Sequence, residues 1–184
     1  MYAHVFETPA GFCGLLWEAA GVAGLCLPER HADAAAVAIR RRNRAAPAGL
    51  LADPPADIRA LVGAIGRYFD GERQDFSAVP LVLRAREPFF GRVYAAVRGL
   101  GWGETTTYGA LAASLGAGPE AAREVGRALG ANPVPLLVPC HRVLAAGNRL
   151  GGFSAPGGAE TKRRMLALEG VAVGATAAQA AFSF

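Results

Sequence analysis

The chain has three cysteines, a single lysine and no long apolar run. Because no apolar stretch approaches the ~20 residues that cross a bilayer, the sequence predicts no membrane span. The first 25 residues contain Glu7 and Glu18 but neither lysine nor arginine, which is not the pattern of a secretory signal. Neither Cys-x-x-Cys nor His-x-x-x-His spacing occurs, so we expect no closed zinc site and no bound metal.

The cysteines, Cys13, Cys26 and Cys140, are odd in number and widely spaced. This usage indicates reduced thiols rather than a disulfide framework, and it predicts a cytoplasmic protein. The formal net charge of +4 permits a polyanionic partner such as nucleic acid, although many soluble proteins are as basic. At 184 residues, the chain has room for one domain or two small ones.

Residues 1–85 are predicted to form a small α/β domain. Short β-prone runs over residues 3–28 alternate with glycines at Gly11, Gly21 and Gly24, a pattern typical of an antiparallel meander with turns at the glycines. Later in this part, apolar residues recur at helical spacing. The other expected elements are helices at 31–43 and 56–69, a loop with Pro47, Pro54 and Pro55 between them, and a strand or extended linker at 76–83.

Residues 86–170 are predicted to form a second, mostly helical domain. Thr107 is expected to cap a helix, glycines at 116–118 turn the chain, and Pro119 opens the next helix. Two helices joined by such a turn make a helix-turn-helix outline. The expected elements are helices at 89–97, 107–115, 119–129 and 158–168, a hairpin at 144–153 that could serve as a wing, and a loosely ordered tail at 171–184.

Residues 132–143 read Asn-Pro-Val-Pro-Leu-Leu-Val-Pro-Cys-His-Arg-Val and carry the pattern with the most chemical content. Three prolines stiffen the approach to Cys140 and discourage regular helix or strand there. His141 follows directly, and nearby cationic or hydrogen-bonding groups raise the population of the reactive thiolate. A buried structural cysteine is the alternative that these residues alone leave open.

This block resembles the active-site signature of the O6-alkylguanine-DNA alkyltransferases, the methylated-DNA–protein-cysteine methyltransferases. Its centre is 139–143, preceded at the family's spacing by 132–135. Other segments that resemble the family follow in its order. They are 103–112 around Tyr108, 121–126 at the start of the DNA-reading helix, 151–154 in the pocket loop, and 168–170 with the closing Glu169.

The resemblance implies an α+β chain in which a ribonuclease H-like N-terminal domain precedes a winged helix-turn-helix catalytic domain. It implies a partner, double-stranded DNA that contains O6-alkylguanine, with O4-alkylthymine left open as a second substrate. The protein would flip the damaged base out of the duplex and transfer its alkyl group irreversibly to Cys140. It would do so once, as a monomer and without a cofactor.

The family's functional residues map onto this sequence position by position. Cys140 would be the nucleophile, His141 would accept its proton through a water, Glu169 would orient the imidazole, and Asn132 would brace the active-site turn. The Tyr108 hydroxyl would donate toward guanine N3. The other implied substrate contacts are Val143 through its backbone, Ser154 facing O6, Phe153 and Pro135.

The helix at 119–129 would lie in the minor groove of DNA, with Arg123 filling the gap that the extruded base leaves. The other implied DNA contacts are Ala122, Arg127 and Thr107. From the residues alone, we would prefer a helix that packs tightly on its neighbours with two exposed arginines, and the resemblance reverses that preference.

Two other classes of protein compete with this interpretation. A cysteine hydrolase would need a histidine in direct contact with the thiol, and the remaining His4 and His31 lie in segments without a site-like context. A non-catalytic DNA-binding or regulatory module on the same scaffold would typically replace the cysteine, and this chain keeps Cys140. We therefore prefer the alkyltransferase.

Overall fold

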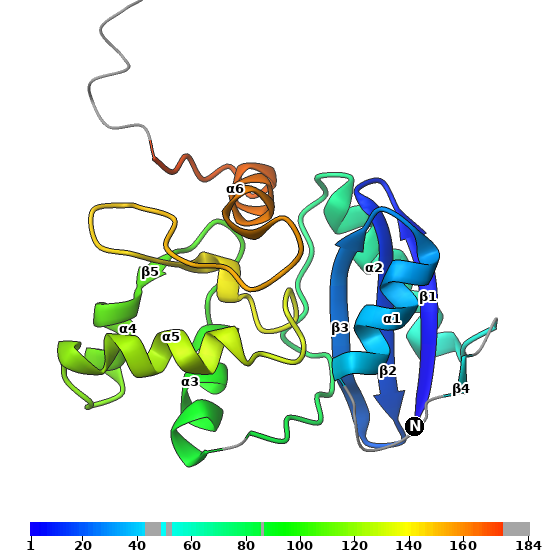
Figure 1. The fold of residues 1–184 in the computed structure, drawn as a ribbon, viewed down its shortest axis with the longest axis horizontal. Coiled ribbons are helices and arrows are strands. Elements are labelled where there is room, and N and C mark those ends of the chain that lie inside the picture. The colour runs from blue at the N-terminus through cyan, green and yellow to red at the C-terminus, as the bar shows by residue number, and fades with distance from the viewer. Residues whose placement is uncertain (43–48, 51–52, 86, 175–184) are drawn as a thin grey trace, which may run out of the picture.

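The computed structural model describes residues 1–42, 49–50, 53–85 and 87–174 (Figure 1). It confirms an α+β chain, in which a sheet with two helices lies beside a mostly helical second half. In the ranges described, no helix is long and apolar enough to cross a membrane.

The first half contains a four-stranded sheet in the order β3-β2-β1-β4. The predicted meander is confirmed, because β1, β2 and β3 pair in antiparallel fashion, and the short β4 joins β1 in parallel. The strands are β1 (Tyr2–Thr8), β2 (Gly11–Glu18), β3 (Gly21–Glu29) and β4 (Gly49–Leu50).

The glycines of the meander have different roles. Gly11 and Gly21 begin strands with positive φ of 125° and 139°, so each lies at a turn as expected. The turn expected at Gly24 is wrong, because this residue lies inside β3. A Cβ at Gly24 would come within 3.2 Å of the Leu16 Cβ, so close packing between β2 and β3 explains the glycine there.

Two helices cover the sheet, one on each face (Figure 1). The predicted helices are confirmed as α1 (Ala32–Arg42) and α2 (Ala56–Phe69). Ile39 of α1 packs with Leu16 and Cys26 on one face, and α2 contributes to the larger core on the other. Of the loop prolines between these helices, Pro47 lies outside the described residues.

Segments distant in sequence cover the outer edge of β3. Residues 76–83 form an extended linker with one bridge, the Val22 N–H donates to the Pro80 carbonyl at 2.9 Å, and the Val82 N–H donates to the Val22 carbonyl at 2.8 Å. Farther along the same edge, the Leu25 N–H donates to the Pro133 carbonyl at 2.9 Å. An uncovered strand edge invites pairing with other chains, and here the edge instead holds the start of the segment 132–143, which contains Cys140.

The second half is built around packed helices, and its predicted helices are confirmed within three residues at each end. Thr107 Oγ1 accepts a hydrogen bond from the Ala110 N–H at 3.1 Å and so caps α4 as expected. The elements are α3 (Pro88–Arg98), β5 (Thr106–Thr107), α4 (Tyr108–Ser114), the 3-10 turn η1 (Pro119–Ala121), α5 (Ala122–Gly130), the 3-10 turn η2 (Cys140–Arg142), β6 (Val143–Leu144) and α6 (Gly158–Leu168).

Two local expectations need correction. Pro119 opens η1, and the α-helical hydrogen bonds begin only at Ala122. The hairpin expected at 144–153 is reduced to one antiparallel bridge between Ala145 and Arg149, closed by the turn at 147–148. Gly151, with φ of 69°, takes the chain out of the extended region before a second strand can form.

The hydrophobic core runs through both halves of the molecule. One cluster of buried residues joins Leu25 of β3 and Tyr68 of α2 to Val93 of α3, Val138 of the segment 132–143 and Met165 of α6. Because this cluster is continuous, the sheet of the first half supports the segment that carries Cys140.

Candidate active site

Cys140 lies on the wall of a cavity of about 460 Å³ between α5 and the loop at 152–154. The residue is only 6% exposed, so access to its thiol is through this cavity. The lining residues are Tyr108, Ala122, Gly126, Leu129, Gly130, Cys140, Gly152, Phe153 and Ser154.

A tight turn stabilised by Asn132 precedes Cys140. The Asn132 side chain is buried, where Oδ1 accepts from the Val134 N–H at 3.0 Å and Nδ2 donates to the Val138 carbonyl at 2.9 Å. Between these anchors, Leu136 has φ of 77°, a left-handed conformation that is strained for a side chain with a Cβ. The Cys140 N–H donates to the Val138 carbonyl at 2.8 Å and begins η2.

His141 is fully buried and pairs with Glu169. Its Nε2 lies 2.7 Å from Glu169 Oε1, which places the ring proton on Nε2. Nδ1 is buried and has no hydrogen-bond partner among the residues that the structure describes. Burial lowers the pKa of His141, and this effect outweighs the opposing influence of Glu169. The imidazole is therefore neutral at pH 7 and its Nδ1 has a lone pair to accept a proton.

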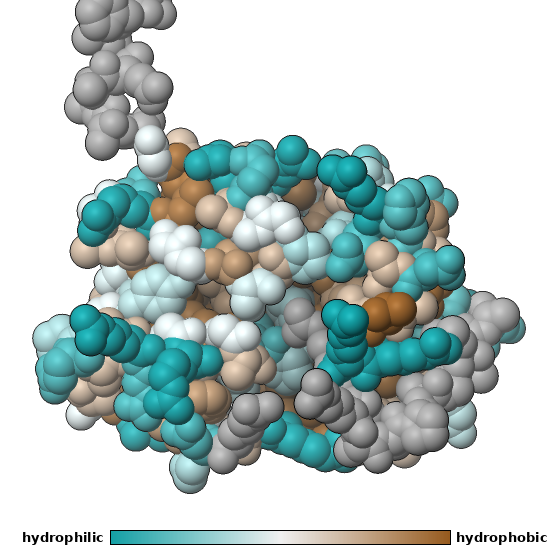
Figure 2. All heavy atoms as spheres, viewed as in Figure 1, coloured by the Kyte–Doolittle hydropathy of each residue, from teal (hydrophilic) through white to brown (hydrophobic). Residues whose placement is uncertain are grey.

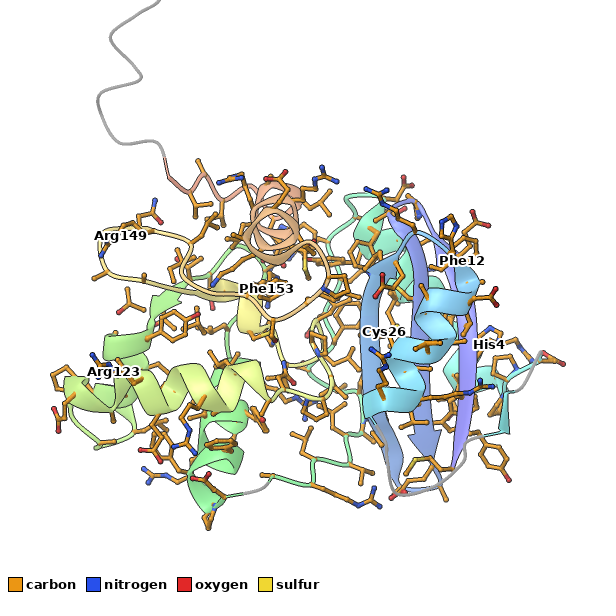
Figure 3. All side chains as sticks on the ribbon, viewed as in Figure 1. His4, Phe12, Cys26, Arg123, Arg149 and Phe153 are labelled. Carbon is orange, nitrogen blue, oxygen red and sulfur yellow. The ribbon has the colours of Figure 1, made fainter. Side chains whose placement is uncertain are left out.

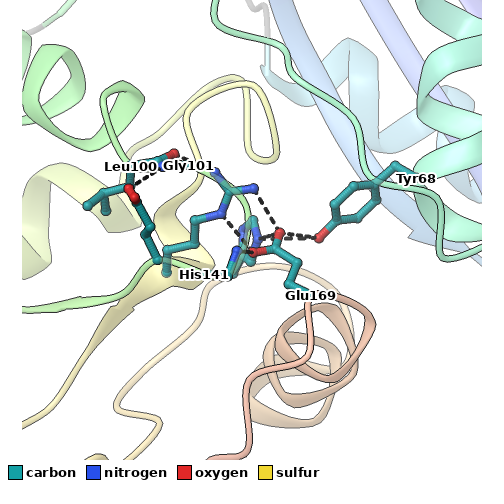
Figure 4. A network of polar contacts seen from close by, with 8 residues as sticks. Tyr68, Leu100, Gly101, His141 and Glu169 are labelled. Carbon is teal, nitrogen blue, oxygen red and sulfur yellow. Dashed lines mark hydrogen bonds and ion pairs between the residues drawn. The ribbon is translucent and has the colours of Figure 1, made fainter.

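Glu169, just after α6, accepts hydrogen bonds from four residues (Figure 4). Oε1 accepts from His141, from the Tyr68 hydroxyl at 2.9 Å and from Arg142 Nη2 at 2.9 Å. Oε2 accepts from Arg142 Nε at 2.8 Å and from the Gly103 N–H at 3.2 Å. Burial acts to raise the pKa of the Glu169 carboxyl, but the hydrogen bonds and charges of His141 and Arg142 outweigh this effect and lower the pKa to about 2.

Tyr108 and Lys162 also lie near Cys140. Lys162 is completely buried, donates to the Val143 carbonyl at 2.6 Å and lies 5.6 Å from the centre of the Tyr108 ring. Burial lowers the pKa of Lys162 to about 8, against a smaller opposing effect of Cys140. Burial, and then Cys140, raises the pKa of Tyr108, so its hydroxyl stays protonated and donates to the Gly152 carbonyl at 3.3 Å.

The predicted substrate-binding residues are placed unequally around the cavity. Phe153 and Ser154 line it, and Ser154 Oγ donates to the Gly130 carbonyl at 3.2 Å. Val143 is fully buried behind Cys140 and contributes its carbonyl to Lys162. Pro135 is buried in the turn before Cys140 and is not among the described residues that line the cavity.

The predicted DNA-binding residues lie at the start of α4 and along α5. Arg123 is exposed near the start of α5, below the loop that carries Phe153 (Figure 3), and makes no ion pair with another described residue. Arg127 is also exposed, but it forms an ion pair with Glu87 at 3.0 Å and lies over the Phe90 ring. Figure 2 shows hydrophilic side chains at the lower left of the view, where α4 and α5 lie in Figure 1. Ala122 lines the cavity, and Thr107 is the cap of α4.

Sequence reasoning missed three polar residues of the site: Tyr68, Arg142 and Lys162. Arg142 follows His141 directly, so its place in the conspicuous motif was the available signal. Lys162 lies three and four residues before Met165 and Leu166, and this spacing places it on the buried face of α6. Tyr68 had no local signal beyond an apolar helix face. No group of three or more His, Cys, Asp or Glu residues within the described ranges could hold a metal ion.

Comparisons with known proteins agree with the geometry. A family model described as "6-O-methylguanine DNA methyltransferase, DNA binding domain" matches residues 88–171. The methylated-DNA–protein-cysteine methyltransferase of Metallosphaera sedula is 47% identical over 106 residues, which are 58% of this chain and 64% of that protein. A "DNA base-flipping protein" of Thermus thermophilus is 49% identical over 90 residues, 49% of this chain and 59% of that one. The chain thus matches less than two thirds of the length of either relative.

A solved structure extends the likeness to almost the whole chain. Mycobacterium tuberculosis OGT in complex with DNA has a TM-score of 0.74 and 33% sequence identity. The superposition covers 92% of this chain and 92% of that chain, so it includes the sheet of the first half as well as the helices of the second.

Proposed function

The chain belongs to the methylated-DNA–protein-cysteine methyltransferase family, and from this premise we propose that it repairs DNA by transferring the alkyl group of O6-alkylguanine to its own Cys140. The observation that carries the proposal is the position of Cys140 on a cavity wall. The next residue in the chain, His141, forms a buried pair with Glu169. A buried structural cysteine would need neither the cavity nor the pair.

The cavity suits a single flipped base. Its volume of about 460 Å³ is within the range of small-molecule sites, roughly 300–1,000 Å³. The O6 atom of guanine lies inside a base pair, so a thiol reaches its alkyl group only after the nucleotide is extruded. The wall residues Gly126, Gly130 and Gly152 have no side chains, which leaves room for the base between α5 and the 152–154 loop.

Transfer is an in-line displacement at the alkyl carbon. The Cys140 proton passes through a water to Nδ1 of His141, and the thiolate then forms the sulfur–carbon bond. The carbon–O6 bond breaks, and its electron pair moves into the guanine ring. The Tyr108 hydroxyl donates a hydrogen bond to guanine N3 as this charge develops. His141 then releases its proton to water, and the guanine takes up one proton from water at N1. The products are an alkylated Cys140 and an unmodified guanine, with the thiol hydrogen replacing the alkyl group.

The charges around Cys140 support these roles. His141 is neutral at pH 7 because burial lowers its pKa, so it is in the form that accepts a proton. Tyr108 stays protonated and can donate. Lys162 is buried beside the thiol and, with a pKa of about 8, is mainly a cation at neutral pH, which favours the thiolate. A thioether is a poor leaving group, so the reaction ends after one turnover.

We propose that α4, the Gly116–Gly118 turn and α5 act as a helix-turn-helix unit that places α5 on duplex DNA. The exposed Arg123 would occupy the gap that the extruded base leaves. The bridge between Ala145 and Arg149, with its turn, would act as a reduced wing.

The N-terminal part, residues 1–85, would be a ribonuclease H-like domain and residues 86–170 the winged catalytic domain, followed by the tail at 171–184. The meander with a parallel β4 beside β1 supports the first assignment. We further propose that the protein acts as a monomer in the cytoplasm, where its three cysteines would stay reduced.

A non-catalytic base-flipping module is the second candidate, favoured by the likeness to the Thermus thermophilus protein. Such a module needs the cavity and α5 but not a reactive cysteine. Cys140, His141 and Glu169 therefore distinguish the two candidates, and all three are present in this chain.

The test is an intact-mass measurement after incubation with duplex DNA that contains O6-methylguanine. We expect each protein molecule to gain one methyl group on Cys140, repair to stop at one lesion per molecule, and Cys140→Ala to bind but not repair. Sustained turnover would favour a true enzyme. Binding without a mass change in the wild type would favour the base-flipping module.

A further inference from the structure

Tyr68 brings a hydroxyl group from the first half of the chain into the His141–Glu169 pair. It lies in α2, 73 residues before His141 and 101 residues before Glu169. Its hydroxyl donates to Glu169 Oε1 at 2.9 Å, and its oxygen lies 3.3 Å from His141 Nε2 (Figure 4). The Tyr68 hydroxyl therefore contacts both Glu169 Oε1 and His141 Nε2, the two atoms that join the carboxylate to the imidazole.

Aromatic side chains fix the direction of this hydroxyl. The Tyr68 ring is fully buried and makes edge contacts with Phe69 at 5.1 Å and with Trp102 at 5.5 Å between ring centres, while Phe76 lies 6.2 Å away. Burial, and then the Glu169 charge, raises the pKa of Tyr68 well above its ordinary value. The hydroxyl therefore remains protonated wherever the thiol and the imidazole titrate, and it remains a donor.

We infer that Tyr68 is a positioning residue for alkyl transfer, because its hydroxyl holds Glu169 Oε1 against His141 Nε2 and so supports proton transfer from Cys140. This inference rests on the proposed function. It also gives the first half of the chain a part in the chemistry, beyond its support of the core.

The two carboxylate oxygens of Glu169 show why the hydroxyl matters. Oε2 is held by Arg142 and by the Gly103 amide. Oε1, the atom that meets the imidazole, is held by Arg142 Nη2 and by Tyr68. Without the Tyr68 hydroxyl, Arg142 Nη2 is the one described donor to Oε1 besides the imidazole itself, so the imidazole loses part of its fixed orientation.

Among the described residues, the charged and titratable groups that act on His141 and Cys140 come from η2, α4 and α6. Arg142 on η2 and Lys162 on α6 both act to lower the pKa of His141, and Tyr108 and Lys162 face Cys140. Replacing Tyr68 with phenylalanine leaves all of them in place, so a changed pH profile reports the hydroxyl.

The experiment compares wild type, Tyr68→Phe and Tyr94→Phe in the full-length protein. Tyr94 is the matched control, because it is also buried and its hydroxyl donates to the Ala128 carbonyl at 2.9 Å, away from the pair. Reaction of Cys140 with iodoacetamide is followed against pH by peptide mass spectrometry, which separates Cys140 from Cys13 and Cys26. His141→Ala gives the profile of a protein without the imidazole.

For Tyr68→Phe we expect the midpoint of the profile to move upward by roughly half a pH unit to one unit, with about threefold to tenfold slower reaction at neutral pH. Tyr94→Phe should keep the wild-type midpoint even if it melts at a lower temperature. A Tyr68→Phe midpoint that is unchanged or moves downward would overturn the inference.

Methyl transfer from O6-methylguanine DNA, measured on the same samples, separates this inference from the proposed function. If wild type transfers methyl groups and Tyr68→Phe has the wild-type pH profile, the inference fails and the proposed function stands. If wild type transfers nothing while the midpoint moves as expected, the proposed function fails and the effect of Tyr68 on the thiol stands.

A measurement on the wild type alone covers the case in which Tyr68→Phe does not fold. The chain has three histidines, and nitrogen NMR of histidine-labelled protein reports the tautomer of each. The inference requires a neutral His141 with its proton on Nε2 at pH 7. A proton on Nδ1 would overturn it, because Nε2 could not then donate to the oxygen that Tyr68 holds.

Discussion

At Glu169, a carboxylate and a guanidinium are buried together. Burying such a pair is costly unless hydrogen bonds satisfy the remaining donors and acceptors. Arg142 makes two bonds to Glu169 and a third to the Leu100 carbonyl, and Glu169 accepts from three further residues. The stability of the site therefore depends on the charge of Glu169 as well as on its shape.

Glu169→Gln should lower the free energy of unfolding by about 3 kcal/mol at pH 7, because it leaves the buried Arg142 charge without its counterion. Urea denaturation measures the change. Glu7→Gln is the control, since Glu7 is exposed on β1 and forms no ion pair within the described part of the chain. It should change the stability by less than about 0.5 kcal/mol. Equal effects of the two substitutions would contradict a structural role for the Glu169 charge.

The same carboxylate makes stability depend on pH. Its pKa is about 2 in the folded protein against 4.5 ordinarily, so its stabilising effect is complete above pH 4.5 and is lost as the pH falls toward 2. His141 adds a second loss below pH 6.5, because burial lowers its pKa and the unfolded chain takes up the proton first. Glu169→Gln should retain the loss below pH 6.5 and lack the one between pH 4.5 and 2.

The residues of the site were predictable from sequence only where they belong to a linear motif. Asn132, Cys140 and His141 lie within a span of ten residues, and their surroundings identify them. Tyr68 enters from another helix through tertiary packing, and no pattern around it distinguishes it from a core tyrosine. Burial of Lys162 is equally a result of the packing of α6 on Val143.

At the scale of elements, α5 combines a cavity wall and an exposed charge on neighbouring positions. Ala122, Gly126 and Gly130 line the cavity, and Arg123 is exposed beside them. The ends of such helices followed from helical periodicity and from the Thr107 cap. The hairpin expected at 144–153 is not formed in full, because Gly151 and Gly152 break the strand pattern that Gly147 and Asn148 suggested.

Arg123→Ala should slow methyl transfer from duplex DNA by at least about tenfold, because extrusion of a base costs a few kcal/mol and Arg123 would occupy the gap. Reaction with free O6-methylguanine, which needs no extrusion, should be nearly unchanged. Single-turnover rates on the two substrates measure the ratio. Arg163→Ala on α6, an exposed arginine paired with Glu160, is the control and should leave both rates intact.

Equal losses on duplex and free base would show instead that Arg123 acts within the pocket or in folding. Affinity of the wild type for duplex DNA should fall with added salt, because neutralised phosphates release counterions. A binding constant that is independent of salt would contradict the placement of α5 on DNA.

At the scale of the whole molecule, several contacts among the described residues join the two halves. The Leu25 amide holds the Pro133 carbonyl, Tyr68 holds Glu169, and the hydrophobic core is continuous between the sheet and the helices. A boundary near residue 85 that the composition suggests is therefore crossed by packing. Sequence patterns locate helices and strands but carry little information on which distant faces meet.

Because the core is shared, the chain should unfold in one cooperative transition. Its two tryptophans test this, since Trp17 lies in β2 and Trp102 precedes α4 in the second half. Trp102 also packs against Tyr68 of α2, so it reports the contact between the halves. The Trp102→Phe variant reports Trp17 alone, and the Trp17→Phe variant reports Trp102 alone. In each variant, the remaining tryptophan fluorescence should follow the same urea curve as the circular dichroism.

If the Trp17 fluorescence changed at a lower urea concentration than the helical circular dichroism signal, the first half would unfold separately. The support that it gives to Cys140 through Pro133 and Tyr68 would then be lost before the rest of the molecule unfolds.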